Sequence, residues 1–163
     1  MRQKKTQKIK FDAGFTKRLR MAIVRTDYHR ELNDNLEKHC RRTLELHGVL
    51  GENIKTFSAP GSWEIPLVAQ AAAETGKFDA ILAFGVIVKG ETYHFEMIAN
   101  ECARALMQIA YDYKLPVAIE VLAVYEMAQA RVRAGDNEAN KGIEGAEAVL
   151  AALDTLRGID DEV

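Results

Sequence analysis

Short apolar runs alternate along the chain with stretches in which apolar residues recur every three or four positions. The runs predict β-strands, at residues 21–24, 54–58, 80–88 and 117–124. The helical spacing predicts amphipathic helices at residues 33–47, 64–75, 93–113, 125–133 and 141–157. In the first of these helices one face carries Leu36, Cys40, Leu44 and His47. Strand and helix thus follow one another from residue 21 onward.

The run at residues 80–88 is apolar without alternation, which is typical of a strand covered on both faces. Repeated strand–helix units with short links favour an α/β fold, a parallel sheet with helices on both faces. Such sheets bind ligands outside the carboxyl ends of their strands. The segments to search are therefore residues 25–29, 59–64, 85–94 and 121–126.

The segment at residues 60–66, PGSWEIP, follows the second predicted strand. Gly61 allows close backbone approach, and Glu64 at a helix start could cap free N–H groups. Pro66 falls in the first helical turn, where its missing N–H costs little. The alternative interpretation is a capped turn with a packed Trp63.

A second segment, at residues 85–96, leaves the apolar strand and passes through Gly90 into a helix. Free N–H groups at a helix start bind anions, and the Thr92 hydroxyl adds a donor. We expect His94 one turn into the helix, where it could transfer a proton near neutral pH. It could equally be a surface histidine. The spacing fits neither a P-loop nor a dinucleotide fingerprint.

The third segment runs from Arg131 to Gly142. Arginine at a helix end can bind phosphate through two hydrogen bonds, and the segment offers Arg131 and Arg133, followed by Lys141. The alternative is a cation that complements the helix dipole.

Composition narrows the class of protein. Apolar residues make up 48% and prolines number 3, which excludes a disordered or collagen-like chain. No apolar run is long enough to span a membrane. Cys40 and Cys102 fall at apolar helix positions and are expected to be buried free thiols in a reducing compartment. We find no metal-ligand spacing and no serine nucleophile motif, and therefore expect no metal site.

Charge divides the chain unevenly. The first 20 residues hold eight basic side chains and one acidic one, a net charge of +7. Of the totals of 22 basic and 24 acidic residues, 14 and 23 remain, so the rest carries −9. The basic stretch lacks the apolar segment of a secretory signal and the aromatic residues of a nucleic-acid site. We therefore expect a basic N-terminal arm at residues 1–19, a single domain at residues 20–163, and neither nucleic acid nor membrane as partner.

Taken together, PGSWEIP (60–66), GVIVKGETYHFEMIANE (85–101) and RAGDNEANKG (133–142) resemble the 6,7-dimethyl-8-ribityllumazine synthase family, over roughly residues 20–157. The resemblance implies a flavodoxin-like three-layer αβα sandwich with a four-stranded parallel sheet. It implies a cytoplasmic, cofactor-free transferase of riboflavin biosynthesis. This enzyme condenses 5-amino-6-(D-ribitylamino)uracil with 3,4-dihydroxy-2-butanone 4-phosphate, releasing phosphate and water.

The same resemblance implies an assembly. It is a homopentamer with active sites between subunits, in many members built into a 60-subunit icosahedral shell, with riboflavin synthase as a further partner. The loop at residues 133–142 has the length found in shell-forming members. The N-terminal segment would lie along a neighbouring subunit's sheet edge, where opposite charge could guide it.

Site residues follow from the resemblance position by position. His94 matches the proton-transfer residue. The phosphate would be held by Glu91, Thr92, Arg133 and Lys141. The pyrimidine and ribityl chain would be held by Tyr28, Ser62, Trp63, Glu64, Val86, Ile87, Val88 and, from a neighbour, Ile119.

Some positions depart from the family pattern, above all Ile119, where a phenylalanine is usual. They motivate an alternative, a non-catalytic protein that binds lumazine or flavin. A generic flavodoxin-like FMN protein is disfavoured, because residues 25–28 lack a Ser/Thr-rich phosphate loop.

Overall fold

A four-stranded parallel sheet forms the centre of the computed structural model, which describes residues 10–163. Its strands lie in the order β2 (Ile54–Ala59), β1 (Met21–Thr26), β3 (Ala80–Val88) and β4 (Val117–Val124). Met21 pairs with Ile54 on one side and with Ala80 on the other. The predicted fold class and all four predicted strands are confirmed.

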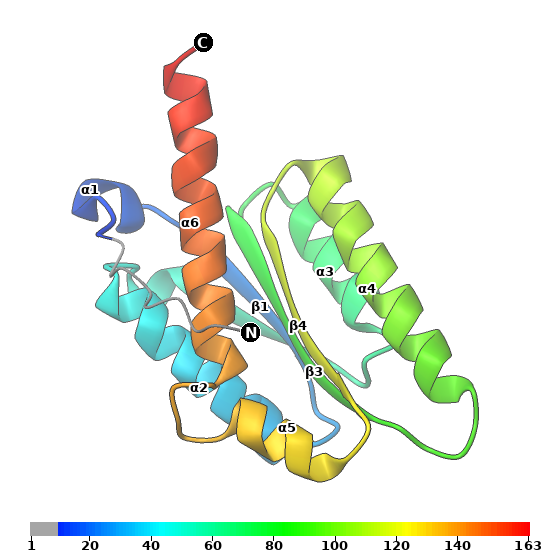
Figure 1. The fold of residues 1–163 in the computed structure, drawn as a ribbon. Helices are drawn as coiled ribbons and strands as arrows, with labels where there is room; N and C mark the ends of the chain where they lie inside the picture. The colour runs from blue at the N-terminus through cyan, green and yellow to red at the C-terminus, as the bar shows by residue number, and fades with distance from the viewer. Residues whose placement is uncertain (1–9) are drawn as a thin grey trace.

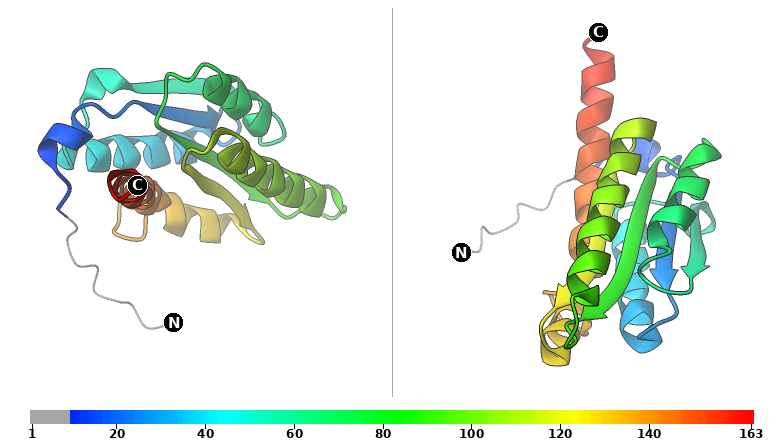
Figure 2. Two further views of the ribbon diagram at one scale, coloured as in Figure 1. Left: turned by 90° about the horizontal axis from the view of Figure 1, so that it is seen from above. Right: turned by 90° about the vertical axis from the view of Figure 1, so that its right-hand side faces the viewer.

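Helices cover both faces of the sheet (Figure 1). One layer holds α2 (Arg30–Leu46), α5 (Met127–Ala134) and α6 (Lys141–Asp161). The other holds α3 (Ile65–Glu74) and α4 (His94–Tyr113). The end-on and side views in Figure 2 show the same three layers, with α6 extending past the end of the sheet. The result is the αβα sandwich that the alternation of strands and helices predicts.

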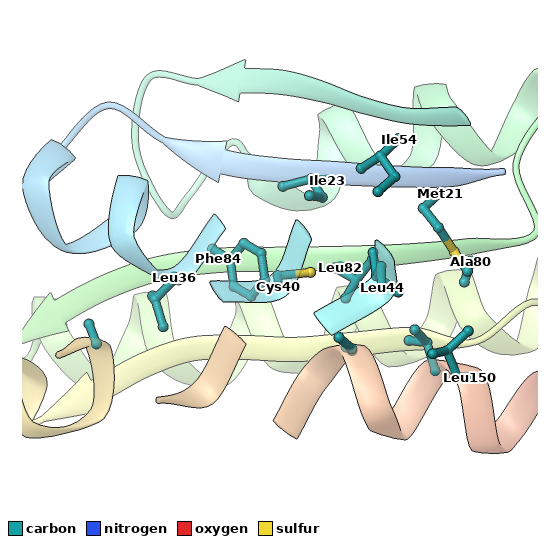
Figure 3. Packing of buried hydrophobic residues seen from close by; sticks show 14 of the residues in the cluster. Met21, Ile23, Leu36, Cys40, Leu44, Ile54, Ala80, Leu82, Phe84 and Leu150 are labelled. Atoms are coloured by element: carbon teal, nitrogen blue, oxygen red, sulfur yellow. The ribbon is translucent and has the colours of Figure 1, made fainter. Parts of the chain in front are cut away.

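Alternate side chains of β1 enter two separate cores. Met21 and Ile23 face the layer of α2 and α6, while Ala22 and Val24 face α3 and α4. In the first core they meet Leu36, Cys40 and Leu44 of α2 (Figure 3). Cys102 is buried in the second core. Both cysteines are free and buried, as predicted.

Strand β2 is one of the two edges of the sheet, since it pairs with β1 alone; β4 is the other. Only the end residues of β2, Ile54 and Ala59, are buried, and Phe57 is 38% exposed. An edge strand leaves one row of backbone N–H and C=O groups without strand partners.

The residues before β1 pack against the domain. Asp12 caps a short helix, α1 (Ala13–Thr16), through a 2.7 Å hydrogen bond from the Phe15 N–H. The ring of Phe15 lies 4.4 Å from the guanidinium of Arg157 on α6, and Phe11 stacks edge-on against His47. Residues 1–9 of the predicted arm lie outside the described residues. The division of the chain at residue 19 stays a prediction.

Helix boundaries differ from the predictions by up to four residues, and the end of α4 and the start of α6 agree with them. The largest shifts are at α2, which begins at Arg30, and α6, which ends at Asp161. Two short elements were not predicted, α1 and the 3-10 turn η1 (Gly51–Asn53). No helix among residues 10–163 has the length and apolar character needed to span a membrane.

Candidate functional site

A cavity of about 540 Å³ opens at the carboxyl edge of the sheet. It lies where the ends of β1 and β3 meet the start of α4, as expected for a parallel sheet. Its lining includes seven residues predicted from the sequence: Tyr28, Ser62, Val86, Ile87, Val88, Thr92 and His94. Five further residues line it that sequence reasoning missed as site residues: His29, Lys89, Gly90, Phe95 and Ile98.

A buried asparagine, Asn33, holds the turn that follows β1. The Asn33 amide donates to the carbonyl of Tyr28 at 2.8 Å and to the Thr26 hydroxyl oxygen at 3.0 Å. Tyr28 itself is 67% exposed and meets the ring of His29 edge-on at 4.6 Å. His29 has a φ of 55°, an uncommon backbone conformation outside glycine. The fixed backbone therefore presents an exposed aromatic face at the cavity.

The turn between β2 and α3 approaches β3 closely. A Cβ atom at Gly85 would lie 2.9 Å from the Ser62 hydroxyl oxygen, so glycine is required for this contact. Ser62 thereby reaches the cavity, while Trp63 is 50% exposed and lies outside its lining.

Glu64 does not cap α3 as predicted. It occupies the N-cap position with φ −93° and ψ −9°, but its carboxylate makes no capping hydrogen bond. The helical backbone at this residue directs the side chain away from the first N–H groups, whereas capping residues are typically extended. Glu64 does not line the cavity either. Pro66 does fall in the first turn, as predicted.

The turn between β3 and α4 brings Thr92 and His94 to the cavity. His94 is the first residue of α4, and the prediction that it lies one turn inside the helix is wrong. The N-cap residue, Tyr93, makes no side-chain capping bond, so the first N–H groups of α4 remain available to a ligand. Glu91 is exposed and points outside the lining. The site thus combines the amide end of a helix, a hydroxyl and an imidazole.

Lys89 ties this turn to its surroundings. Its ammonium lies 2.9 Å from Oε1 of Glu96 and 5.4 Å from the ring centre of Tyr125. Its backbone N–H donates to the Val124 carbonyl at the end of β4. The hydrogen bond between the side chains raises the pKa of Lys89 and lowers that of Glu96. The pair is thus charged throughout the neutral range.

Besides Trp63, Glu64 and Glu91, three further predicted site residues lie outside the cavity lining in the single chain. Ile119 on β4 packs against the core beneath α3 and α4. Arg133 lies in the last turn of α5 and donates to the Gln129 carbonyl at 3.0 Å. Lys141, the first residue of α6, forms an ion pair with Glu144. Within one chain, Arg133 therefore lies where a cation complements the dipole of α5, which is the alternative given for it above.

Beside Lys141, Glu120 faces α6 from β4. Burial raises the pKa of its carboxyl to about 7, and the charge of Glu144 adds to this shift while Lys141 opposes it. Gly145 makes room for the side chain, since a Cβ there would lie 3.0 Å from Cγ of Glu120.

A second hollow of about 680 Å³ lies between α2 and α5. It contains none of the predicted site residues, and its lining mixes both charges: Arg30, Lys38 and Arg131 with Glu31, Asp34 and Asp136. The residues of sequence positions 10–163 include no cluster of three or more side chains suited to a metal ion.

The missed residues had partial signals in the sequence. Lys89, Gly90 and Phe95 stand inside the motif at residues 85–96, but no local rule assigns a role to them. The pairing of Lys89 with Glu96 joins a strand end to a helix across a turn, which spacing alone does not reveal.

The chain is an α/β protein with a parallel sheet between two helical layers and a cavity at the carboxyl ends of its strands. In this class the loops that follow the strands carry the functional residues. A family model described as 6,7-dimethyl-8-ribityllumazine synthase matches residues 18–157. The chain belongs to this family of riboflavin biosynthesis enzymes, and its resemblance to the family is confirmed.

Similar proteins carry the same description. A 6,7-dimethyl-8-ribityllumazine synthase of Cupriavidus necator is 41% identical over 147 residues, 88% of each chain. One of Thermococcus gammatolerans is 40% identical over 151 residues, 92% of this chain and 96% of the relative. One of Neisseria gonorrhoeae is 42% identical over 120 residues, 74% and 76% of the two chains.

Proposed function

We propose that the chain condenses 5-amino-6-(D-ribitylamino)uracil with 3,4-dihydroxy-2-butanone 4-phosphate to give 6,7-dimethyl-8-ribityllumazine, the penultimate step of riboflavin biosynthesis. The observation that carries the proposal is the meeting of three groups in one cavity. An exposed aromatic ring (Tyr28), the free amide end of α4 with Thr92, and an imidazole (His94) all line it. These groups suit stacking of a pyrimidine, binding of a phosphate and transfer of a proton.

The proposed steps are those of an imine condensation followed by ring closure. The pyrimidine amine attacks the ketone carbonyl of the second substrate, and loss of water gives an imine. The C3 proton is then lost as phosphate leaves from C4, and the resulting enol becomes a ketone. The ribitylamino nitrogen attacks that ketone to close the ring, and a second water is lost. His94 would accept and return protons in these steps, while the ends of β3 and α4 hold both reactants in register. No metal or cofactor is needed for this sequence.

We further propose that Arg133, Lys141 and Ile119 complete the site from an adjacent subunit of a homopentamer. The absence of these residues from the cavity of the single chain supports this arrangement. So do exposed apolar side chains on one face of α4, Met97, Met107 and Tyr111, with Tyr93 just before the helix. Asn100 and Arg104 lie between them, so this face combines apolar and polar groups as the surfaces between subunits do.

The larger assembly and the location belong to the same proposal. Five copies of an 18.2 kDa chain give a pentamer of about 90 kDa, and a 60-subunit shell exceeds a megadalton. Light scattering separates the two. The free buried thiols support a reducing compartment, the cytoplasm. Association with riboflavin synthase would be read from co-sedimentation with the shell.

The test is direct assay of the purified protein with both substrates. We expect lumazine fluorescence to appear faster than in the uncatalysed condensation. A protein that binds the lumazine in titration but leaves the rate unchanged would instead be the non-catalytic binder, and the proposed reaction would be wrong.

A further inference from the structure

The turn at residues 89–93 carries the amides and the hydroxyl that face the cavity, yet few contacts hold it. A Cβ atom at Gly90 would meet nothing within 4 Å, so the turn is open on that side. Among residues 10–163, neither Thr92 nor His94 makes a side-chain hydrogen bond. The side-chain contacts of the turn run through Lys89, which bridges to the first turn of α4.

The partner carboxylate depends on that bridge. Glu96 lies two residues after His94 on α4, and one of its oxygens, Oε1, contacts the Lys89 ammonium at 2.9 Å. The other oxygen, Oε2, is buried and has no hydrogen-bond partner among the described residues. The side chain as a whole is 31% exposed, so loss of the lysine would leave Oε1 to water and release the carboxylate from its present position.

Two aromatic rings flank the ammonium of Lys89, whose side chain is 41% exposed. The Nζ atom of Lys89 lies 5.4 Å from the ring centre of Tyr125 and 5.9 Å from that of Phe95. The two rings are themselves 6.2 Å apart. Cations over aromatic faces are attracted to them, so the rings limit where the lysine can lie. Together with the hydrogen bond from the Lys89 N–H to the Val124 carbonyl, they join β3, β4 and α4 at one point.

We propose that Lys89 and Glu96 are a positioning pair, which fixes the turn so that the amides before α4, the Thr92 hydroxyl and the His94 ring face the phosphate-bearing substrate together. The inference rests on the proposed function for its substrate. The pair acts through the turn and not by contact with the reacting atoms. Misplacement of binding groups by about 1 Å costs up to about a hundredfold in rate, so a loosened turn has a measurable effect.

The test compares Lys89→Met, Glu96→Gln and the double variant with the parent. We expect the KM for the butanone phosphate to rise about tenfold in each single variant, with the KM for the pyrimidine within about twofold. The double variant should be no worse than either single one, since the pair acts as a unit. Lys89→Arg should restore the parental values, because it keeps the charge at the same place. Glu101→Gln is the matched control, as it removes an exposed ion pair with Arg104 on the same helix.

Hydrogen exchange gives a second measurement that needs no activity. The amides of residues 90–95 should exchange faster in both single variants and at the parental rate in Glu101→Gln. Parental exchange and kinetics in both variants would overturn the positioning role. A KM effect in Lys89→Met without one in Glu96→Gln would also overturn it, since the lysine would then act directly on the anion. If the parent itself makes no lumazine, the proposed reaction fails, while exchange still decides whether the pair holds the turn.

Discussion

The Nε atom of Arg25 lies 2.7 Å from the Oε2 atom of Glu37, and both side chains are 15% exposed. The pair joins the end of β1 to α2, and Arg25 precedes Tyr28 by three residues in the sequence. Glu37 also accepts hydrogen bonds from Arg41 at 2.8 Å and from the Thr56 hydroxyl at 2.5 Å. One carboxylate thus holds β1, β2 and α2 together near the turn that carries Tyr28.

Glu37→Gln should lower the free energy of unfolding by about 2 kcal/mol at neutral pH, because two arginines lose their shared anion. Burial raises the pKa of Glu37, but the bonds from Thr56 and Arg41 and the charge of Arg25 bring it below the ordinary 4.5. The stabilisation by Glu37 is present above pH 4.5, the ordinary pKa of the unfolded state. It is lost as the pH falls through the lower pKa of the folded state. Urea unfolding at about pH 7 and pH 3.5 should show the difference between variant and parent shrinking; a constant difference would contradict this.

Glu120 should behave in the opposite sense. Its folded pKa is raised to about 7, so its contribution is favourable below the unfolded value of 4.5 and is lost as the pH rises through 7. Glu120→Gln should therefore be more stable than the parent at about pH 8, by about 1–2 kcal/mol after allowance for its partial exposure. The advantage should vanish near pH 5. Equal stability at both values would show that Glu120 titrates normally.

The crossing of α2 and α6 depends on Gly142. A Cβ atom at this position would overlap the carbonyl oxygen of Leu36. Gly142→Ala should thus cost about 1–3 kcal/mol, because the helices must separate. Gly158→Ala is the control on the same helix, where a Cβ meets nothing within 4 Å and alanine should stabilise by up to about 1 kcal/mol. Thermal unfolding of both variants measures this contrast. A similar fall in Tm in the two variants would show that the close approach of α2 and α6 at Gly142 does not explain the loss of stability.

His94→Ala should lower kcat about a hundredfold or more without abolishing turnover, since the positioning of both reactants survives. The KM values should change little. His47→Ala serves as the control, because His47 lies at the end of α2 outside the cavity. Steady-state kinetics at neutral pH decide, and unchanged turnover would refute proton transfer by His94.

Mixed assemblies test whether the site is shared. Arg133→Ala alone should weaken the phosphate substrate, and His94→Ala alone should slow the reaction. If the two residues act from different subunits, random co-assembly at equal amounts restores both in about a quarter of the sites. The specific activity of the mixture should then exceed the mean of the two homogeneous variants. A mixture equal to that mean would place both residues in one subunit.

The parts of the fold that the sequence predicts are those in which local pattern and packing agree. Residues 80–88 are apolar throughout and form the central strand β3, buried on both faces. Helix α1 could not be predicted, because four residues have no helical tendency of their own. They are held by distant contacts, such as that of Phe15 with Arg157.

The same distinction holds for the site residues, some of which local pattern predicts and some of which it does not. Tyr28, Ser62, Thr92 and His94 follow strand ends, and a parallel sheet gathers such residues at one edge. The role of Glu64 as a cap was wrong because the residue type permits capping but the helical backbone at that point prevents it. Arg133 and Lys141 have partners within the single chain that no motif reveals.

The open edge of β2 bears on how the protein is made in cells. Residues Ile54–Ala59 pair with a strand on one side only, with the half-exposed ring of Phe57 between them. A chain that has just folded therefore offers a template to any extended segment nearby. In the proposed pentamer a copy of the same chain would cover that edge before unrelated segments reach it, so faster synthesis would help only while assembly keeps pace with it. Soluble yield should therefore depend on how quickly new subunits find each other, as well as on how stably each one folds.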